Sequence, residues 1–149
     1  MSLDYCLQTK DKTSGRLTYS NLQAALSPEF EILQHQEDKG EISSFSLKHG
    51  DERDPLEFTL LKNGEYIINV YDYDKEIYQR ILRNIARLAQ LLHWSIVDVQ
   101  TQETIESPNP ETFVTKERLD ILEAQAGTII NLPEILEQAE KWRNKNMPL

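Results

Sequence analysis

The chain has 149 residues, 39% hydrophobic and 28% charged, a balance typical of one folded domain rather than of a disordered chain. Its formal net charge of −9 disfavours nucleic acid and anionic membranes as partners, because both are bound through Lys and Arg. No run approaches 18 consecutive apolar residues, and the first residues lack the apolar core of a secretory signal. The single cysteine, Cys6, excludes an intramolecular disulfide and is interpreted as a small apolar residue of an N-terminal strand. Together these features predict a cytoplasmic protein.

The first half of the chain predicts a short helix followed by four antiparallel strands. Ser20 and Gln23 have the spacing of a capping box, and Ser27-Pro28 is a helix stop, so a helix is expected over 20–26. Asn63-Gly64 lies between two alternating apolar runs and favours a type I′ hairpin turn. The four expected strands cover 30–36, 42–48, 56–60 and 66–70.

The strongest periodic pattern predicts a long amphipathic helix over 75–93, capped by Asp72 or Asp74. A short β-branched and aromatic run at 94–99 then predicts a fifth strand. The fold class expected is α+β: a mainly antiparallel sheet of about five strands, with the long helix on one face and a helical hairpin at the C-terminus. The apolar positions of the long helix are Ile77, Ile81, Leu82, Ile85, Leu88, Ala89 and Leu92.

The C-terminal part of the predicted single domain, 1–149, divides into a connector and two helices. A sheet-and-helix body over 1–106 is followed by a connector at 107–111 and a helical hairpin over 112–149. The hairpin has five basic and six acidic residues, so nearly all of the acidic excess lies before it. It is expected to pack on the body or on a partner, and a homodimer is one such arrangement. The expected helices are 115–126, ended by Gly127, and a second one capped by Asn131, with an apolar stripe of Leu132, Ile135, Leu136, Ala139 and Trp142.

The sequence carries no motif for a known cofactor, so none is predicted. Its five glycines are too dispersed for a dinucleotide-binding loop or a P-loop. His35, His49 and His93 show no metal-ligand spacing, and no serine-hydrolase elbow is present. No catalytic residue is assigned.

Asp72, Asp74 and Glu76 are the candidates for a metal site, because alternating carboxylates at a strand end can hold a cation. The run is not an EF-hand loop, since Ile77 stands where that loop needs Gly. Helix capping explains the same acids without a metal, and we favour that interpretation. Asp98 lies in an apolar strand, where it either faces solvent or has a raised pKa, and it is given no role.

Arg80, Arg83 and Arg87 are the candidate binding residues. They fall within roughly 60° of one another on the polar side of the long helix. We call them the basic ridge, and their guanidinium groups suit carboxylate or phosphate recognition. The alternative is a solvated helix face in which Glu76 pairs with Arg80.

Two classes of function remain open from the sequence. The favoured class is a non-enzymatic protein-binding module, such as an inhibitor, immunity-type or adaptor protein, whose partner is another protein, a basic one fitting the acidic surface. The alternative is a small-molecule binding protein or an enzyme whose site is assembled from scattered residues. A concave pocket with two or more titratable groups would favour the alternative, and a flat acidic face with a large apolar patch would favour the first.

Overall fold

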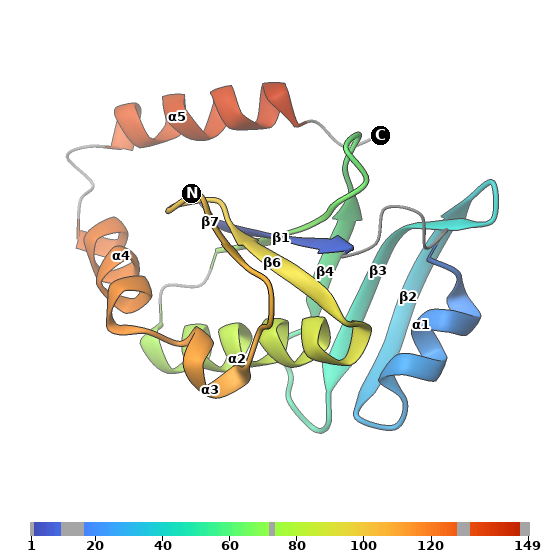
Figure 1. Cartoon of the computed structure of the whole chain (residues 1–149). Coiled ribbons are helices and arrows are strands. Elements are labelled where there is room, and N and C mark those ends of the chain that lie inside the picture. Colours follow the sequence, from blue (N-terminus) through green and yellow to red (C-terminus); the bar gives the residue numbers. More distant parts are fainter. Residues whose placement is uncertain (1, 10–16, 72–73, 128–131, 147–149) are drawn as a thin grey trace.

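The computed structural model describes residues 2–9, 17–71, 74–127 and 132–146. In these ranges the chain forms one seven-stranded sheet with the strand order β2-β3-β4-β5-β1-β6-β7, and every neighbouring pair is antiparallel. The predicted α+β class with an antiparallel sheet is confirmed (Figure 1). The strands are β1 (Leu3–Thr9), β2 (Phe30–Asp38), β3 (Glu41–His49), β4 (Leu56–Leu60), β5 (Tyr66–Val70), β6 (Trp94–Asp98) and β7 (Glu103–Ile105).

The sheet has more strands than the five predicted. β1 is inserted between β5 and β6, and the short β7 forms one edge beside β6. Leu3, Tyr5 and Leu7 of β1 point into the main core, and Cys6 points to the opposite face, where it is also buried. Because β1 is buried on both faces and pairs with β5 and β6, its place in the sheet depends on strands that are distant in the sequence.

The two predicted hairpins use different turns. Lys39 and Gly40 both have positive φ, 54° and 81°, so the β2–β3 hairpin has the type I′ geometry. The type I′ turn predicted at Asn63-Gly64 is wrong, because only Gly64 of that pair has positive φ, 89°. The β4–β5 connection is closed instead by the Leu61 amide, which donates to the Glu65 carbonyl at 2.8 Å.

The helix α1 (Tyr19–Leu26) confirms the predicted helix, but its N-cap lies two residues earlier than predicted. Thr18 is the N-cap, and its hydroxyl accepts from the Asn21 amide at 3.2 Å, so the predicted Ser20 capping box is wrong. Leu22 and Leu26 are buried against the sheet and the second helix.

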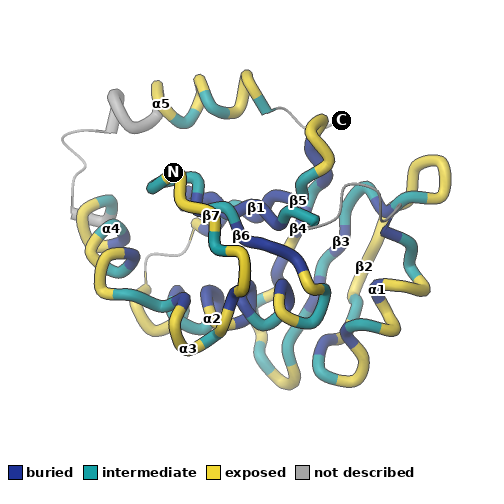
Figure 2. Tube along the Cα trace, viewed as in Figure 1, coloured by how far each residue is buried: buried dark blue, intermediate teal, exposed yellow. Residues whose placement is uncertain are grey.

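The helix α2 (Lys75–Leu92) covers one face of the sheet as predicted (Figure 1). Its apolar stripe is buried, with Ile85 and Leu88 both fully inaccessible to solvent, and Figure 2 shows this buried side facing the strands. Asp74 is the N-cap: its carboxylate accepts from the Glu76 and Ile77 amides at 3.0 and 3.1 Å. Capping therefore accounts for Asp74. None of the helices in the described ranges is long and apolar enough to cross a bilayer.

The C-terminal helices are α3 (Pro110–Phe113), α4 (Lys116–Gly127) and α5 (Leu132–Lys145). The short α3 begins inside the segment predicted as a connector and buries Phe113. Leu122 of α4 joins the main core, on the side of α2. Trp142 of α5 packs on the other face of the sheet, against Cys6, Leu61 and Ile67. The two long C-terminal helices therefore lie against different layers, with α5 across the sheet from α2 (Figure 1).

Candidate functional site

A hollow of about 540 Å³ opens at one end of the sheet, and we call it the end cavity. Its volume lies within the range of small-molecule sites. Seven segments meet there: β1, α1, the start of β3, the β4–β5 turn, β5, the end of α2 and the start of β6. The lining residues are Gln8, Thr9, Leu17, Asn21, Ala25, Glu41, Asn63, Gly64, Glu65, Tyr66, Leu91, Leu92, His93 and Trp94.

The β4–β5 turn fixes one carboxylate in the wall of the end cavity. The Asn63 side chain accepts from the Glu65 amide at 3.0 Å, and Gly64 supplies the positive φ that the turn needs. Gln8 of β1 then donates to the Glu65 carboxylate at 3.0 Å. Glu65 thus forms hydrogen bonds both within the turn and with the inner strand β1.

Two stacked aromatic rings form another part of the wall. Tyr66 and Trp94 lie 5.7 Å apart between ring centroids, with planes inclined by 11°. The Tyr66 hydroxyl donates to the Ile42 carbonyl. The pKa of Tyr66 is raised mainly by burial and secondly by the Glu41 carboxylate. The hydroxyl therefore stays protonated and can donate. Glu41 lines the same hollow as the two rings.

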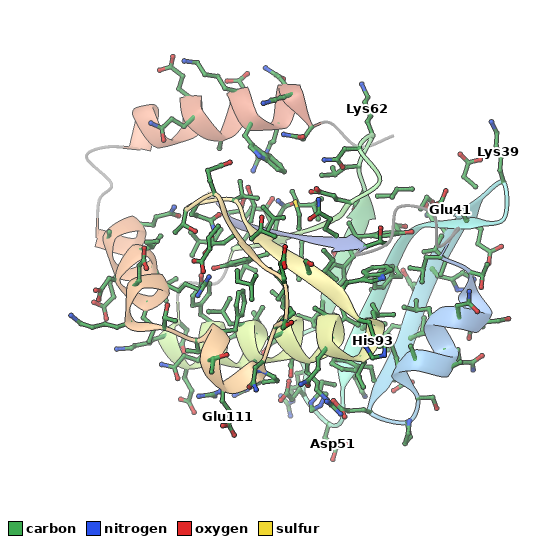
Figure 3. The ribbon with its side chains drawn as sticks, viewed as in Figure 1. Lys39, Glu41, Asp51, Lys62, His93 and Glu111 are labelled. Carbon is green, nitrogen blue, oxygen red and sulfur yellow. The ribbon has the colours of Figure 1, made fainter. Side chains whose placement is uncertain are left out.

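His93 closes the cavity where α2 ends. It has a left-handed backbone, φ 58°, and its amide donates to the carbonyls of Ala89 and Gln90. That conformation usually belongs to Gly, since a Cβ makes it costly. The His93 side chain is exposed, and Figure 3 shows it at the end of α2, on the same side of the molecule as Glu41 and α1.

The basic ridge predicted on α2 lies in a different hollow, of about 690 Å³. Arg87 makes a two-pronged ion pair with Glu29, at 2.7 and 3.0 Å, which lowers the pKa of Glu29 and raises that of Arg87. Arg80 lies 3.8 Å from Asp54. Arg83 is exposed and shows no ion pair within the described ranges. The structure brings the three arginines together, but beside carboxylates that balance two of them.

The predicted alternative for Arg80, an ion pair with Glu76, is replaced by the contact with Asp54. Glu52 and His49 also line this hollow. The Asn84 side-chain amide donates to the Glu52 carboxylate at 2.6 Å. His49 lies 3.6 Å from the Glu29 carboxylate and 3.7 Å from that of Glu52. Recognition of an anion by the ridge stays a prediction.

The metal candidates are not assembled into a site by the part of the chain that the structure describes. Asp74 is used as the cap of α2, Glu76 is exposed on the first turn, and Asp72 lies outside the described residues. No group of three metal-ligating side chains occurs among the described residues.

A buried polar cluster that the sequence did not reveal joins the C-terminal helices to the sheet. The Asp98 carboxylate is fully buried and accepts from the Arg118 Nε at 3.0 Å, while the Arg118 guanidinium lies 4.4 Å from the centre of the Phe113 ring. Asp98 is therefore buried and paired, so it does not face solvent. Beside the pair, the hydroxyls of Tyr5 and Tyr78 are hydrogen-bonded to each other, and burial raises the pKa of both.

This cluster is closed to solvent. Tyr5, Tyr78, Asp98 and Arg118 are each at most 5% exposed, and none of them lines the end cavity or the hollow at the basic ridge. The β1–β6 register explains why Asp98 is buried: Asp98 lies directly opposite Tyr5, so both side chains point into the main core. The cluster is structural.

Comparison of the chain with protein-family models, with curated proteins and with solved structures gave no match. The end cavity is therefore interpreted from its own residues.

Proposed function

We propose that the protein binds a small organic ligand in the end cavity. The observation that carries the proposal is the cavity itself, a hollow of about 540 Å³ lined by an aromatic pair, three leucines and several polar side chains. Ligand sites combine an apolar wall with a few fixed polar groups in this way. The ligand is bound without a reaction, and no catalytic residue is assigned.

Three titratable side chains that are separate in sequence, Glu41, Glu65 and His93, line this one hollow. That is the feature expected of the small-molecule alternative. Among the residues whose side chains the structure describes, the exposed large hydrophobic residues are Leu33 and Tyr71, on separate segments. Leu132, Ile135 and Leu136 of the predicted C-terminal apolar stripe lie outside the described side chains. Small-ligand binding is the function that this geometry supports best, and the protein-binding module stays a prediction.

A fragment screen followed by nuclear magnetic resonance tests the proposal. The chain has two tryptophans, so a Trp142→Phe background leaves the Trp94 indole N–H as a single reporter in the cavity wall. A ligand at 100 times its dissociation constant should also raise the free energy of unfolding by about 2.7 kcal/mol. We expect at least one fragment to shift the Trp94 signal and to stabilise the fold.

Two neighbouring alanines of α1 supply the matched control. Ala25 lines the end cavity, whereas Ala24 is exposed and does not. Ala25→Phe should fill the hollow and abolish binding, while Ala24→Phe should leave affinity unchanged. A screen in which no fragment moves the Trp94 signal, or in which Ala25→Phe binds as the parent does, would refute the proposal.

A further inference from the structure

We propose that the outer edge of β2 is a docking site for an extended, basic segment of a partner protein, which adds to the sheet as a further strand. This inference is independent of the ligand proposed for the end cavity. It rests on three features of the β2–β3 hairpin: a long edge strand, the exposure of the outer part of that strand, and hollows on both of its faces.

β2 is the longer of the two edge strands of the sheet. It spans nine residues, whereas β7 at the opposite edge spans three. Among the described residues β2 pairs with β3 alone, so the main-chain N–H and C=O groups along its outer side face no other strand. Such an edge is a template for an added strand, because a second extended chain offers donors and acceptors at the same spacing.

The residues that flank the undescribed range 10–16 are held by inner strands. Thr9 pairs with β6, and Leu17 accepts from the amide of Ile42 in β3 at 2.9 Å. Neither of these two residues pairs with β2.

The outer part of β2 contributes little to the core. Phe30 is buried and Ile32 packs against the main core, but all six residues from 33 to 38 are exposed, including Leu33 at 44% (Figure 2). A strand of an antiparallel sheet with one covered face normally alternates between buried and exposed positions. Here the alternation stops after Ile32, and the β2–β3 turn projects from the side of the molecule (Figure 1).

Both faces beside β2 are hollowed. A hollow of about 320 Å³ lies between α1 and β2, and Tyr19, Pro28 and Ile32 are among the residues that line it. On the opposite face, a hollow of about 590 Å³ is lined by Gln34 and Gln36 together with polar side chains of β3 and β4. The side chains of an added strand point alternately to the two faces of a sheet, so both sets find open space beside β2.

The charge of the protein favours a basic segment. β2 carries Glu31, Glu37 and Asp38 and has no Lys or Arg. Glu31 lies 3.7 Å from Lys48, and the turn adds one positive charge at Lys39. The formal net charge of −9 counts every residue of the chain, including those outside the described ranges. A basic segment is therefore attracted to the protein and an acidic one repelled.

A second copy of this chain fits the same edge less well. It carries the same net charge of −9, so the two copies repel each other. The β2–β3 pairing also shifts register between Ile32 and Gln34 and again between Gln36 and Glu37. Bulges of this kind bend an edge strand and restrict its pairing with long, flat strands. The regular stretch between the two shifts suits a short segment.

A short synthetic peptide with alternating basic side chains tests the docking site: acetyl-Lys-Val-Lys-Thr-Lys-Val-Lys amide, titrated into the isotope-labelled full chain and followed by nuclear magnetic resonance. The backbone amide signals of residues 31–38 should shift, and hydrogen exchange along this strand should slow. A peptide with Glu in place of each Lys should bind at least tenfold more weakly at low salt.

Methylation of the peptide main chain separates strand addition from simple charge attraction. A peptide that is N-methylated at every central residue keeps its charge and side chains but has no central N–H group to donate on either side. It should bind at least tenfold more weakly than the parent peptide. Equal affinities would refute main-chain pairing.

Lysine substitutions on the two edge strands locate the site. Leu33→Lys and Gln36→Lys each place a Lys on exposed positions of β2, which hinders strand addition, and each should lower the affinity for the parent peptide about tenfold. Thr104→Lys is the matched control, because it makes the same change of charge at an exposed position of β7. It should lower the affinity less than threefold.

The remaining outcomes decide against the proposal. If the peptide shifts no signal of β2, or if Thr104→Lys weakens binding as much as the β2 variants do, the edge is not the docking site. If the full chain sediments as a dimer that Gln36→Lys dissociates, the occupant is a second copy, and the basic partner is refuted. None of these results changes the Trp94 signal that tests the end cavity, so the two proposals fail separately.

Discussion

Replacement of Arg118 by methionine is expected to cost the protein about 3–5 kcal/mol of unfolding free energy, because it leaves a buried carboxylate without its counter-charge. Asp98 is fully buried, and its Oδ2 accepts from Arg118 Nε at 3.0 Å. The other oxygen, Oδ1, keeps its donors, the Gln100 amide at 3.0 Å and side chain at 2.8 Å and the Thr101 amide at 3.3 Å. The variant thus removes the charge and the hydrogen bond that Asp98 accepts from Arg118, and it also removes the Arg118 hydrogen bonds to Phe113, Thr115 and Glu103. The donors to Oδ1 in the loop after β6 are kept.

The opposite replacement, Asp98→Asn, should cost less. The Arg118 guanidinium would still donate to the Phe113 carbonyl at 3.1 Å, lie over the Phe113 ring, and have the Glu103 carboxylate at 3.3 Å. A counter-charge remains for Arg118 in this variant, whereas none remains for Asp98 in the first. The double variant should be more stable than the sum of the two losses predicts, because it removes both charges together.

Urea unfolding followed by circular dichroism measures all three variants, and Lys116→Met is the matched control. Lys116 lies two residues earlier in α4, its side chain is 92% exposed, and its contact with Asp120 is 3.9 Å. An exposed pair of this kind contributes about 0–1 kcal/mol. If Arg118→Met loses less than about 1 kcal/mol, or loses no more than Lys116→Met, the buried pair does not have the stabilising role assigned to it.

Three further predictions concern the core, the acid range and the second face of the sheet. Ile85→Ala should cost about 2–5 kcal/mol in urea unfolding, because Ile85 is fully buried, and an unchanged midpoint would contradict the packing of α2. The Arg87 hydrogen bond lowers the pKa of Glu29, so the ion pair stabilises the fold above the unfolded carboxyl pKa of about 4.3, and this stabilisation is lost as the pH falls through the folded pKa. Glu29→Gln should therefore be less stable than the parent at pH 7 and as stable as the parent near pH 2. A stability difference that persists near pH 2 would count against the ion pair. Burial, then Glu65, raise the pKa of the Cys6 thiol, so its reaction with a disulfide reagent at pH 8 should be slow and should accelerate in Trp142→Ala, whereas equal rates would show that Trp142 does not cover it.

The sequence by itself determined the elements whose signals are local. The helical stripe that includes Ile81 and Ile85 was enough to predict α2 and its buried side, because helix periodicity depends only on residues within a few turns. The capping role of Asp74 and the stop at Ser27-Pro28 follow from the same short range. The hairpin turn at Asn63-Gly64 shows the limit of this reasoning: the glycine was placed correctly, but the strand register around it selected a different turn.

The tertiary structure alone decided which segments meet. Tyr5 and Asp98 became neighbours because β1 is inserted beside β6, a pairing between residues more than ninety positions apart. Strand alternation places each side chain on one of the two faces of a sheet, but it does not show which face is buried. The pairing of β6 with β1 decides this for Asp98, so its burial could not be predicted from the sequence. The end cavity has the same origin: Glu41, Glu65 and His93 belong to segments that show no common motif, and the closing of the sheet on α1 and α2 brings them to one wall. A site made by chain topology has no signature in a single sequence, because no residue in it is unusual for its own local element.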